Sequence, residues 1–295
     1  MRILHKNAIA LLVTLLFIML ITVSITIGLK QVNKTASSLA DENFLFQSSI
    51  ILDDFLNLLK TSPELDAIES PEAFRILMTN LTLIPIDVPN TVISLKVASA
   101  RSKLNINHFK SDERLDILRS FLNRNMVDVS FVDILEDSTA GIKQDLSYNS
   151  TIFDEKPELY RDYITSKEHL DELSRFYSTY YSDDSLDNIQ FSNIFYFSNN
   201  KEYKIDLNYL TPEVWDMLLD CGEDRAIQLS LGIYTTIEDI DLNDNEKSIL
   251  QTFDTSFFEP YVDIVLNIQK NNKTAKIRFE YDIKNKKGSN FVYDI

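Results

Sequence analysis

Few residues in this sequence are suited to catalysis. The chain of 295 residues contains three histidines and one cysteine, Cys221. His108 and His169 have no second histidine or cysteine at the spacing that zinc sites use. Cys221 has no histidine near it in the sequence that could act as its base. With no Gly-x-Ser-x-Gly motif either, the sequence predicts a protein that is not an enzyme and holds no zinc.

Carboxylates are far more numerous than these residues. The chain has 45 Asp and Glu against 29 Lys and Arg, a net charge of −16, which disfavours binding to nucleic acid or to anionic lipid. Pairs such as Asp183 and Asp184 are expected in so acidic a chain and are typical of a hydrated surface. The alternative to a non-enzymatic protein is a membrane-anchored hydrolase that uses some of these scattered acids for catalysis. The five glycines are isolated from one another, which excludes glycine-rich phosphate-binding loops.

Acidic residues also gather between Asp239 and Glu246, where a calcium-binding loop is conceivable. The EF-hand pattern fails there, because its sixth position is Asp244 rather than glycine and its twelfth is Leu250 rather than glutamate. We predict instead that Asn243 or Asp244 caps a helix. No metal ligand is assigned from the sequence.

An apolar segment near the N-terminus could anchor these residues to a membrane. Residues 7–29 contain no charged side chain and are long enough to cross a bilayer as a helix, so we predict a transmembrane helix over residues 9–29. No second apolar stretch approaches this length. The remainder of the chain is therefore expected on one side of the membrane.

The helical pattern continues past the apolar segment. Neither proline nor glycine occurs from Leu29 to Thr61, and Phe46, Ile50 and Phe55 recur at helical spacing. We predict one helix over residues 9–60, ended by Pro63. A membrane anchor followed by a separate amphipathic helix is the alternative.

The middle of the chain has several helix starts. Ser111, Thr165 and Thr211 each precede an apolar stripe and are predicted N-caps, with a capping box from Thr165 to Glu168 and proline at the first helical position after Thr211. This region is therefore expected to be helical.

Both flanks of the helical region show strand periodicity. Apolar residues alternate over residues 261–269 and 274–283, which predicts antiparallel strands, and the sequence around Gly288 supplies a further turn. Residues 91–98 alternate in the same way and could join that sheet. We predict an α+β fold in which a helical insertion interrupts the sheet domain.

The N-terminal arrangement resembles the type IV pilin and pseudopilin superfamily, in which a short leader is removed and the apolar helix begins the mature chain. Cleavage between Ala8 and Ile9 fits this pattern best, with residues 1–8 as the leader. Most pilins carry a glutamate five residues into the mature chain, where this sequence has Val13. An acid within a bilayer is costly unless it is paired. In lacking this acid, the sequence resembles the K-type minor pseudopilin of type II secretion, GspK.

Further stretches are similar to the same family. The first stretch is Leu104–Asn107, where the matching residues are Leu104, Asn105 and Asn107. The second, Phe131–Asp137, is similar to a turn of the family and matches it at Asp133, and the third is Thr165–Leu173. The fourth, Ile205–Trp215, matches the family at Leu207, Asn208, Glu213 and Val214.

The resemblance implies a long N-terminal pilin helix over residues 9–60 and a pilin-like α/β domain in two parts, 61–107 and 253–295, around an inserted helical domain, 108–252. It implies an inner-membrane protein whose C-terminal domain lies in the periplasm. It also implies that a prepilin peptidase removes the leader and that the new N-terminus is methylated.

The implied role is that of a tip subunit of the pseudopilus, which starts its assembly with I- and J-type minor pseudopilins for protein export across the outer membrane. The resemblance also keeps Ca²⁺ among the candidate ligands. The alternatives are a minor pilin of a type IV pilus or competence system, and a single-pass anchored extracytoplasmic sensor or binding protein.

Overall fold

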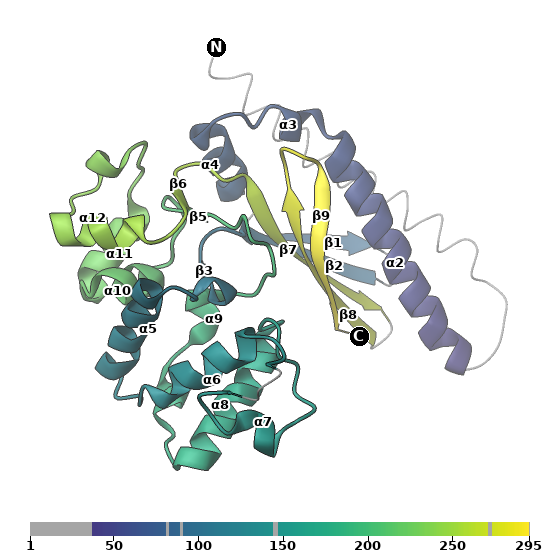
Figure 1. Cartoon of the computed structure of the whole chain (residues 1–295). Helices are drawn as coiled ribbons and strands as arrows, with labels where there is room; N and C mark the ends of the chain where they lie inside the picture. Colours follow the sequence, from purple (N-terminus) through teal and green to yellow (C-terminus); the bar gives the residue numbers. More distant parts are fainter. Residues whose placement is uncertain (1–36, 81–82, 89–90, 144–146, 271–272, 295) are drawn as a thin grey trace. The chain divides into compact units, whose positions relative to one another are not determined.

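The computed structural model describes residues 37–80, 83–88, 91–143, 147–270 and 273–294. The protein combines helices with an antiparallel sheet, which confirms the predicted α+β class (Figure 1). Contacts divide the chain into two compact units. We call residues 1–100 with 260–295 the sheet unit, and residues 101–259 the helical unit.

The expected boundaries at 107/108 and 252/253 fall a few residues inside the limits of the helical unit. The domain division at these expected boundaries stays a prediction.

The sheet unit contains three described helices and a five-stranded sheet. Its elements are α2 (Ser37–Thr61), α3 (Pro63–Asp66), α4 (Pro71–Asn80), β1 (Leu83–Val88), β2 (Thr91–Ser99), β7 (Tyr261–Lys270), β8 (Lys273–Asp282) and β9 (Lys287–Asp294). The strand order is β1-β2-β7-β8-β9, and all neighbours are antiparallel.

The central strand pair joins two parts of the sequence that the whole helical unit separates. β2 pairs with β7 in a register that places Leu95 opposite Leu266, and both side chains are buried. The predicted strands at 91–98, 261–269 and 274–283 are confirmed, and β9 follows the predicted turn. β1 was not predicted from the sequence, and it forms one edge of the sheet.

Helix α2 belongs to the sheet unit and packs an apolar face into its core. Phe55 is buried, and its ring meets Phe279 of β8 edge to face at 6.3 Å. The predicted helix end before Pro63 is confirmed, because α2 stops at Thr61 and Pro63 opens α3. The predicted apolar face was wrong at Phe46, which is 66% exposed. The buried face instead runs through Phe44, Ile51, Leu52, Phe55 and Leu58.

No helix in the described part of the chain is long and apolar enough to span a membrane. The predicted transmembrane residues 9–29 lie outside that part.

The helical unit is built from short helices and two small parallel strand pairs. Its elements are β3 (Leu104–Asn105), η1 (Ile106–His108), α5 (Asp112–Arg124), α6 (Ser130–Thr139), α7 (Ile152–Glu155), α8 (Lys167–Tyr181), η2 (Ser185–Asn188), α9 (Phe191–Ile194), β4 (Phe195–Tyr196), β5 (Ile205–Asp206), α10 (Pro212–Leu219), α11 (Glu223–Leu231), η3 (Ile237–Asp239), α12 (Asp244–Gln251) and β6 (Thr255–Ser256). β3 pairs with β4, and β5 pairs with β6.

Local capping signals set several of these helix starts. The Ser111 and Thr211 side chains accept hydrogen bonds from backbone N–H groups in the first turns of α5 and α10, and Asn243 forms a capping box with Glu246 at α12. The cap predicted at Thr165 was wrong by one residue. Ser166 caps α8 by accepting from the His169 N–H.

The core of the helical unit is aromatic and aliphatic. Phe131 of α6 lies with its ring 5.4 Å from Tyr177 of α8 and 5.8 Å from Phe191 of α9. Trp215 of α10 is fully buried. Residues 131–137, expected as a turn, lie within helix α6 because their apolar side chains pack at helical spacing against α8.

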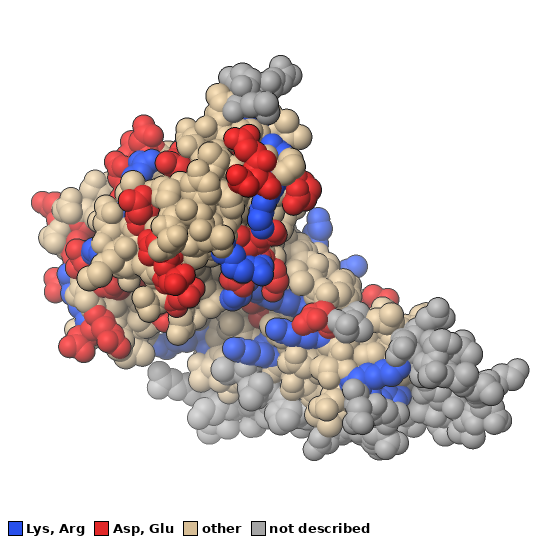
Figure 2. All heavy atoms as spheres, turned by 90° about the horizontal axis from the view of Figure 1, so that it is seen from below, with Lys and Arg blue, Asp and Glu red and all other residues tan. Residues whose placement is uncertain are grey.

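The two units differ in charge. Residues 101–259 contain 15 Lys and Arg against 32 Asp and Glu, a net charge of −17, whereas the rest of the chain contains 14 against 13 and nets +1. Figure 2 shows acidic side chains in several groups on one face of the molecule. The acidity of the protein is therefore a property of the helical unit.

Candidate functional site

Two asparagines of the Leu104–Asn107 stretch hold distant segments of the helical unit together. The Asn105 amide donates to the Ser198 carbonyl at 3.0 Å. The Asn107 amide donates to the Ile164 and Ser198 carbonyls at 3.0 and 3.1 Å, and its oxygen accepts from the Ile164 N–H at 2.7 Å. Both side chains are buried. An amide is suited to this position because it both donates and accepts.

Asn208 performs the same task farther along the chain. Its amide nitrogen donates to the Tyr234 carbonyl at 3.0 Å and to the Phe257 carbonyl at 2.8 Å, while its oxygen accepts from the Tyr234 N–H at 2.7 Å. Asp206 lies beside it, fully buried, and accepts from the N–H groups of Asn208 and Glu259. Burial raises the pKa of Asp206 to about 6, against the effect of these hydrogen bonds.

The remaining predicted motif residues serve packing or helix ends. Leu104, Leu207 and Val214 are buried in the core. Glu213, in the first turn of α10, accepts from the Asn193 amide at 2.7 Å. Burial raises the pKa of Asp133 in α6. The structure thus spreads the predicted residues through the scaffold of the helical unit and does not gather them into one reactive cluster.

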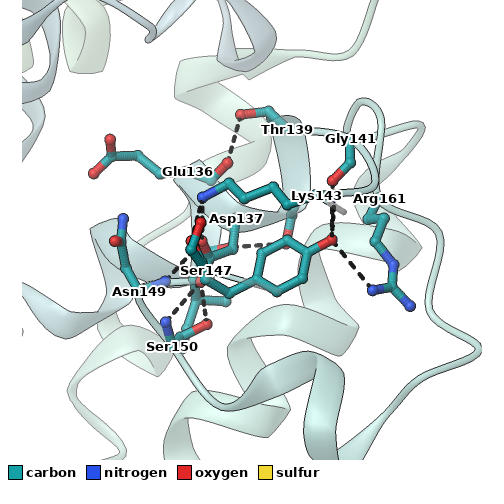
Figure 3. A network of polar contacts seen from close by, with 12 residues as sticks. Glu136, Asp137, Thr139, Gly141, Lys143, Ser147, Asn149, Ser150 and Arg161 are labelled. Carbon is teal, nitrogen blue, oxygen red and sulfur yellow. Dashed lines mark hydrogen bonds and ion pairs between the residues drawn. The ribbon is translucent and has the colours of Figure 1, made fainter. Parts of the chain in front are cut away.

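A polar network that the sequence did not predict is centred on Asp137, near the end of α6 (Figure 3). Its carboxylate is fully buried and accepts from the N–H groups of Asn149 and Ser150 at 3.0 and 2.7 Å, and from the Ser150 hydroxyl at 2.7 Å. Lys143 lies 3.7 Å from the same carboxylate. The network ties residues 147–150 to α6.

Tyr148 extends this network on the other side of the loop. Its hydroxyl donates to the Gly141 carbonyl at 3.1 Å and accepts from the Lys143 N–H at 3.0 Å. The Arg161 guanidinium lies above the Phe153 ring at 4.1 Å. The only sequence signal for this network was an acid, Asp137, inside an amphipathic helix, and its partners could not be identified without the tertiary structure.

The residues with nucleophilic or basic side chains are engaged in the scaffold. His108 Nε2 lies 2.8 Å from the Asn200 carbonyl, and burial lowers the pKa of both His108 and His169. Burial raises the pKa of the Cys221 thiol, which disfavours the nucleophilic thiolate. The Cys221 sulfur faces the carbonyls of Trp215 and Gly222.

The acids between Asp239 and Glu246 also have protein partners. Asp239 accepts from Thr235 and Thr236, and these hydrogen bonds lower its pKa to about 2. Glu246 pairs with Arg225 and completes the capping box of α12. Among the described residues, no group of three or more His, Cys, Asp or Glu side chains could hold a metal ion.

The predicted processing residues Ala8 and Ile9, and the missing-acid position Val13, lie outside the described residues.

Comparison with known proteins finds a similarity of fold that bears on the function. No protein-family model and no curated protein sequence matches the chain. Among solved structures, it is similar to a chain of the GspK-GspI-GspJ complex from the type 2 secretion system of enterotoxigenic Escherichia coli, with a TM-score of 0.56 and 12% sequence identity. The similarity covers 85% of this chain and 96% of that chain. The predicted resemblance to the K-type minor pseudopilins is confirmed at the level of the fold.

Proposed function

We propose that this chain is a non-enzymatic minor pseudopilin at the tip of a type II secretion pseudopilus, where it initiates assembly for protein export across the outer membrane. The observation that carries the proposal is the fold likeness, which extends over most of both chains at a TM-score of 0.56. That likeness includes far more of the chain than the short sequence motifs do.

The N-terminal sequence supports membrane insertion and processing. Residues 9–29 would anchor the mature chain in the inner membrane, with the described units in the periplasm. A prepilin peptidase would cut between Ala8 and Ile9, and the new N-terminus would be methylated.

Val13 supports a position at the tip. A pilin acid within the bilayer is matched by the terminal amine of a neighbouring subunit, and an unmatched acid there is costly. A subunit with no neighbour above it has no such amine. An apolar residue at this position therefore suits the last subunit of a filament.

The partners follow from the same proposal. The similar solved structure is a complex that contains GspK, GspI and GspJ. We expect this chain to assemble with I- and J-type minor pseudopilins of its own system.

Mass spectrometry of the mature N-terminus tests the proposal most directly. The full chain, coexpressed with its own prepilin peptidase, should lose residues 1–8 and carry a methyl group on Ile9. An Ala8→Trp variant should remain uncut, and an Ala8→Gly variant should be cut as well as the natural chain. A natural chain that keeps Met1 under these conditions would contradict the proposal, as would a labelled chain found along the whole filament shaft.

A further inference from the structure

A groove on the helical unit has an apolar floor. It is bordered by α5, α10 and α11 and has a volume of about 370 Å³, at the lower end of the range for ligand pockets. Phe121, Ile189, Ile194 and Ala226 contribute buried apolar side chains to its lining. This volume is large enough to accept an apolar side chain together with part of the segment that carries it.

The same groove has an acidic rim. Glu213 and Asp216 of α10 and Glu223 of α11 line it, and no Lys or Arg is among the described residues that do so. Glu213 and Asp216 accept hydrogen bonds from neutral donors, the Asn193 amide and the Gly222 N–H. These bonds leave the negative charges in place.

Arg124 is a cation that contacts α10, and it is already engaged. Arg124 donates to the backbone carbonyls of Asp216 and Met217 and forms an ion pair with Asp220. The helical unit as a whole carries a net charge of −17. The groove therefore lies in a strongly negative field, which attracts cationic groups.

One edge of the groove continues into exposed apolar surface. Ile227 lines the groove and is 40% exposed, and Leu231, one helical turn later, is 76% exposed. Residues four positions apart share one face of a helix. Ile227 and Leu231 thus extend the apolar lining of the groove onto the exposed surface of α11.

We propose that this groove binds a protein segment in which an apolar side chain is flanked by Lys or Arg. The apolar side chain fills the floor and packs against Ile227, while the flanking cations pair with Glu213 and Glu223. Charge complementarity favours such a segment over an acidic or a purely apolar one. The inference concerns the helical unit and does not depend on the role in a filament.

The test uses the full chain in phosphatidylcholine nanodiscs and a synthetic peptide that alternates Leu and Lys. Trp215 is the single tryptophan of the chain and belongs to α10, so its fluorescence reports on the groove when the peptide contains no aromatic residue. We expect a saturable change in Trp215 emission. A peptide with Glu in place of every Lys should bind at least about tenfold more weakly, a difference of about 1.4 kcal/mol.

Matched variants distinguish binding in the groove from nonspecific attraction to the acidic surface of the helical unit. Glu213→Gln/Glu223→Gln should weaken binding about tenfold or more, whereas Glu155→Gln/Glu202→Gln, which removes the same charge from other exposed positions, should change it less than about twofold. Ile227→Ser should weaken binding, and Ile142→Ser, at an exposed site elsewhere, should not.

Three results would overturn the proposal. The first is equal binding of the Lys and Glu peptides. The second is equal loss in the groove and control variants, which would show a nonspecific effect of charge. The third is concentration-dependent self-association of the chain that Ile227→Ser abolishes, because the occupant would then be a second copy.

Discussion

At the scale of single residues, two asparagine amides connect distant backbone segments of the helical unit. Asn107 and Asn208 each make three hydrogen bonds to backbone groups that are far away in the sequence. Buried backbone groups that lose a partner are costly. The similarity of these residues to family motifs is therefore consistent with a role in holding the fold.

Replacement of Asn107 by alanine should strongly destabilise the helical unit. It leaves the Ile164 N–H and carbonyl without their side-chain partner, at a cost of about 3 kcal/mol or more, whereas the Ser198 carbonyl keeps its hydrogen bond from the Asn105 amide. Urea unfolding of the full chain, followed by Trp215 fluorescence, measures this change. Asn123→Ala, at an exposed position of α5, is the control and should change stability by less than about 0.5 kcal/mol. Equal effects of both substitutions would contradict the assigned role.

Asp206 should make stability depend on pH near neutrality. Its pKa is raised to about 6 in the folded protein, whereas an aspartate in an unfolded chain titrates near about 4. Its contribution to stability is therefore complete below about pH 4 and is lost as the pH rises through about 6.

Comparison with Asp206→Asn isolates this effect. Between about pH 4 and 7, the natural chain should lose up to about 3 kcal/mol relative to the variant. Urea unfolding at several pH values measures this difference. Parallel pH profiles for the two proteins would show that Asp206 does not titrate in this range.

At the scale of elements, packing against the sheet determines which face of α2 is buried. Both Phe46 and Phe55 fit a helical apolar stripe, yet only Phe55 is buried, against Phe279. The sheet buries one side of the helix, and Phe46 falls outside that contact.

This difference predicts unequal effects of two otherwise similar substitutions. Phe55→Ala should lower the free energy of unfolding by about 3–5 kcal/mol, because it leaves a cavity against β8. Phe46→Ala, on the same helix, should change it by less than about 1 kcal/mol. Thermal unfolding of the full chain in nanodiscs, followed by circular dichroism, compares the two. A large loss of stability in Phe46→Ala alone would contradict the observed face.

At the scale of the whole molecule, the chain leaves the sheet unit and returns to it at neighbouring positions. Ser99 pairs with Val262, and the Ala100 N–H donates to the Tyr261 carbonyl at 2.9 Å. The helical unit thus begins and ends where two adjacent strands meet. This geometry suits an insertion that leaves the sheet intact.

Removal of the helical unit should therefore preserve the sheet. A chain in which a short Gly-Ser linker replaces residues 101–259 should retain cooperative unfolding and slow amide exchange in β2, β7 and β8, because their pairing does not use the removed residues. The same deletion combined with Ile264→Asp, which places a charge in the core, should lose that protection. Absence of protected amides in the first variant would show that the sheet needs the helical unit.

The sequence by itself determined the elements whose signals are local. Alternation over residues 261–269 and 274–283 marked two strands, and Thr211, Pro212 and Asn243 marked helix starts, because these signals connect residues only a few positions apart. The helical insertion was also visible as a change of period between two stretches of strand pattern.

Only the tertiary structure decided which distant residues meet. The buried face of α2 and the groove of the helical unit depend on contacts between segments that are far apart in the sequence. The pairing of β1 with β2 and the Asp137 network join nearer segments, but their partners also became evident only in the folded chain. Hydrophobic patterns show that a side chain is suited to burial, but the surface that buries it exists only after the chain has folded. The physical reason is that periodicity acts along the chain, whereas packing and charge pairing act through space.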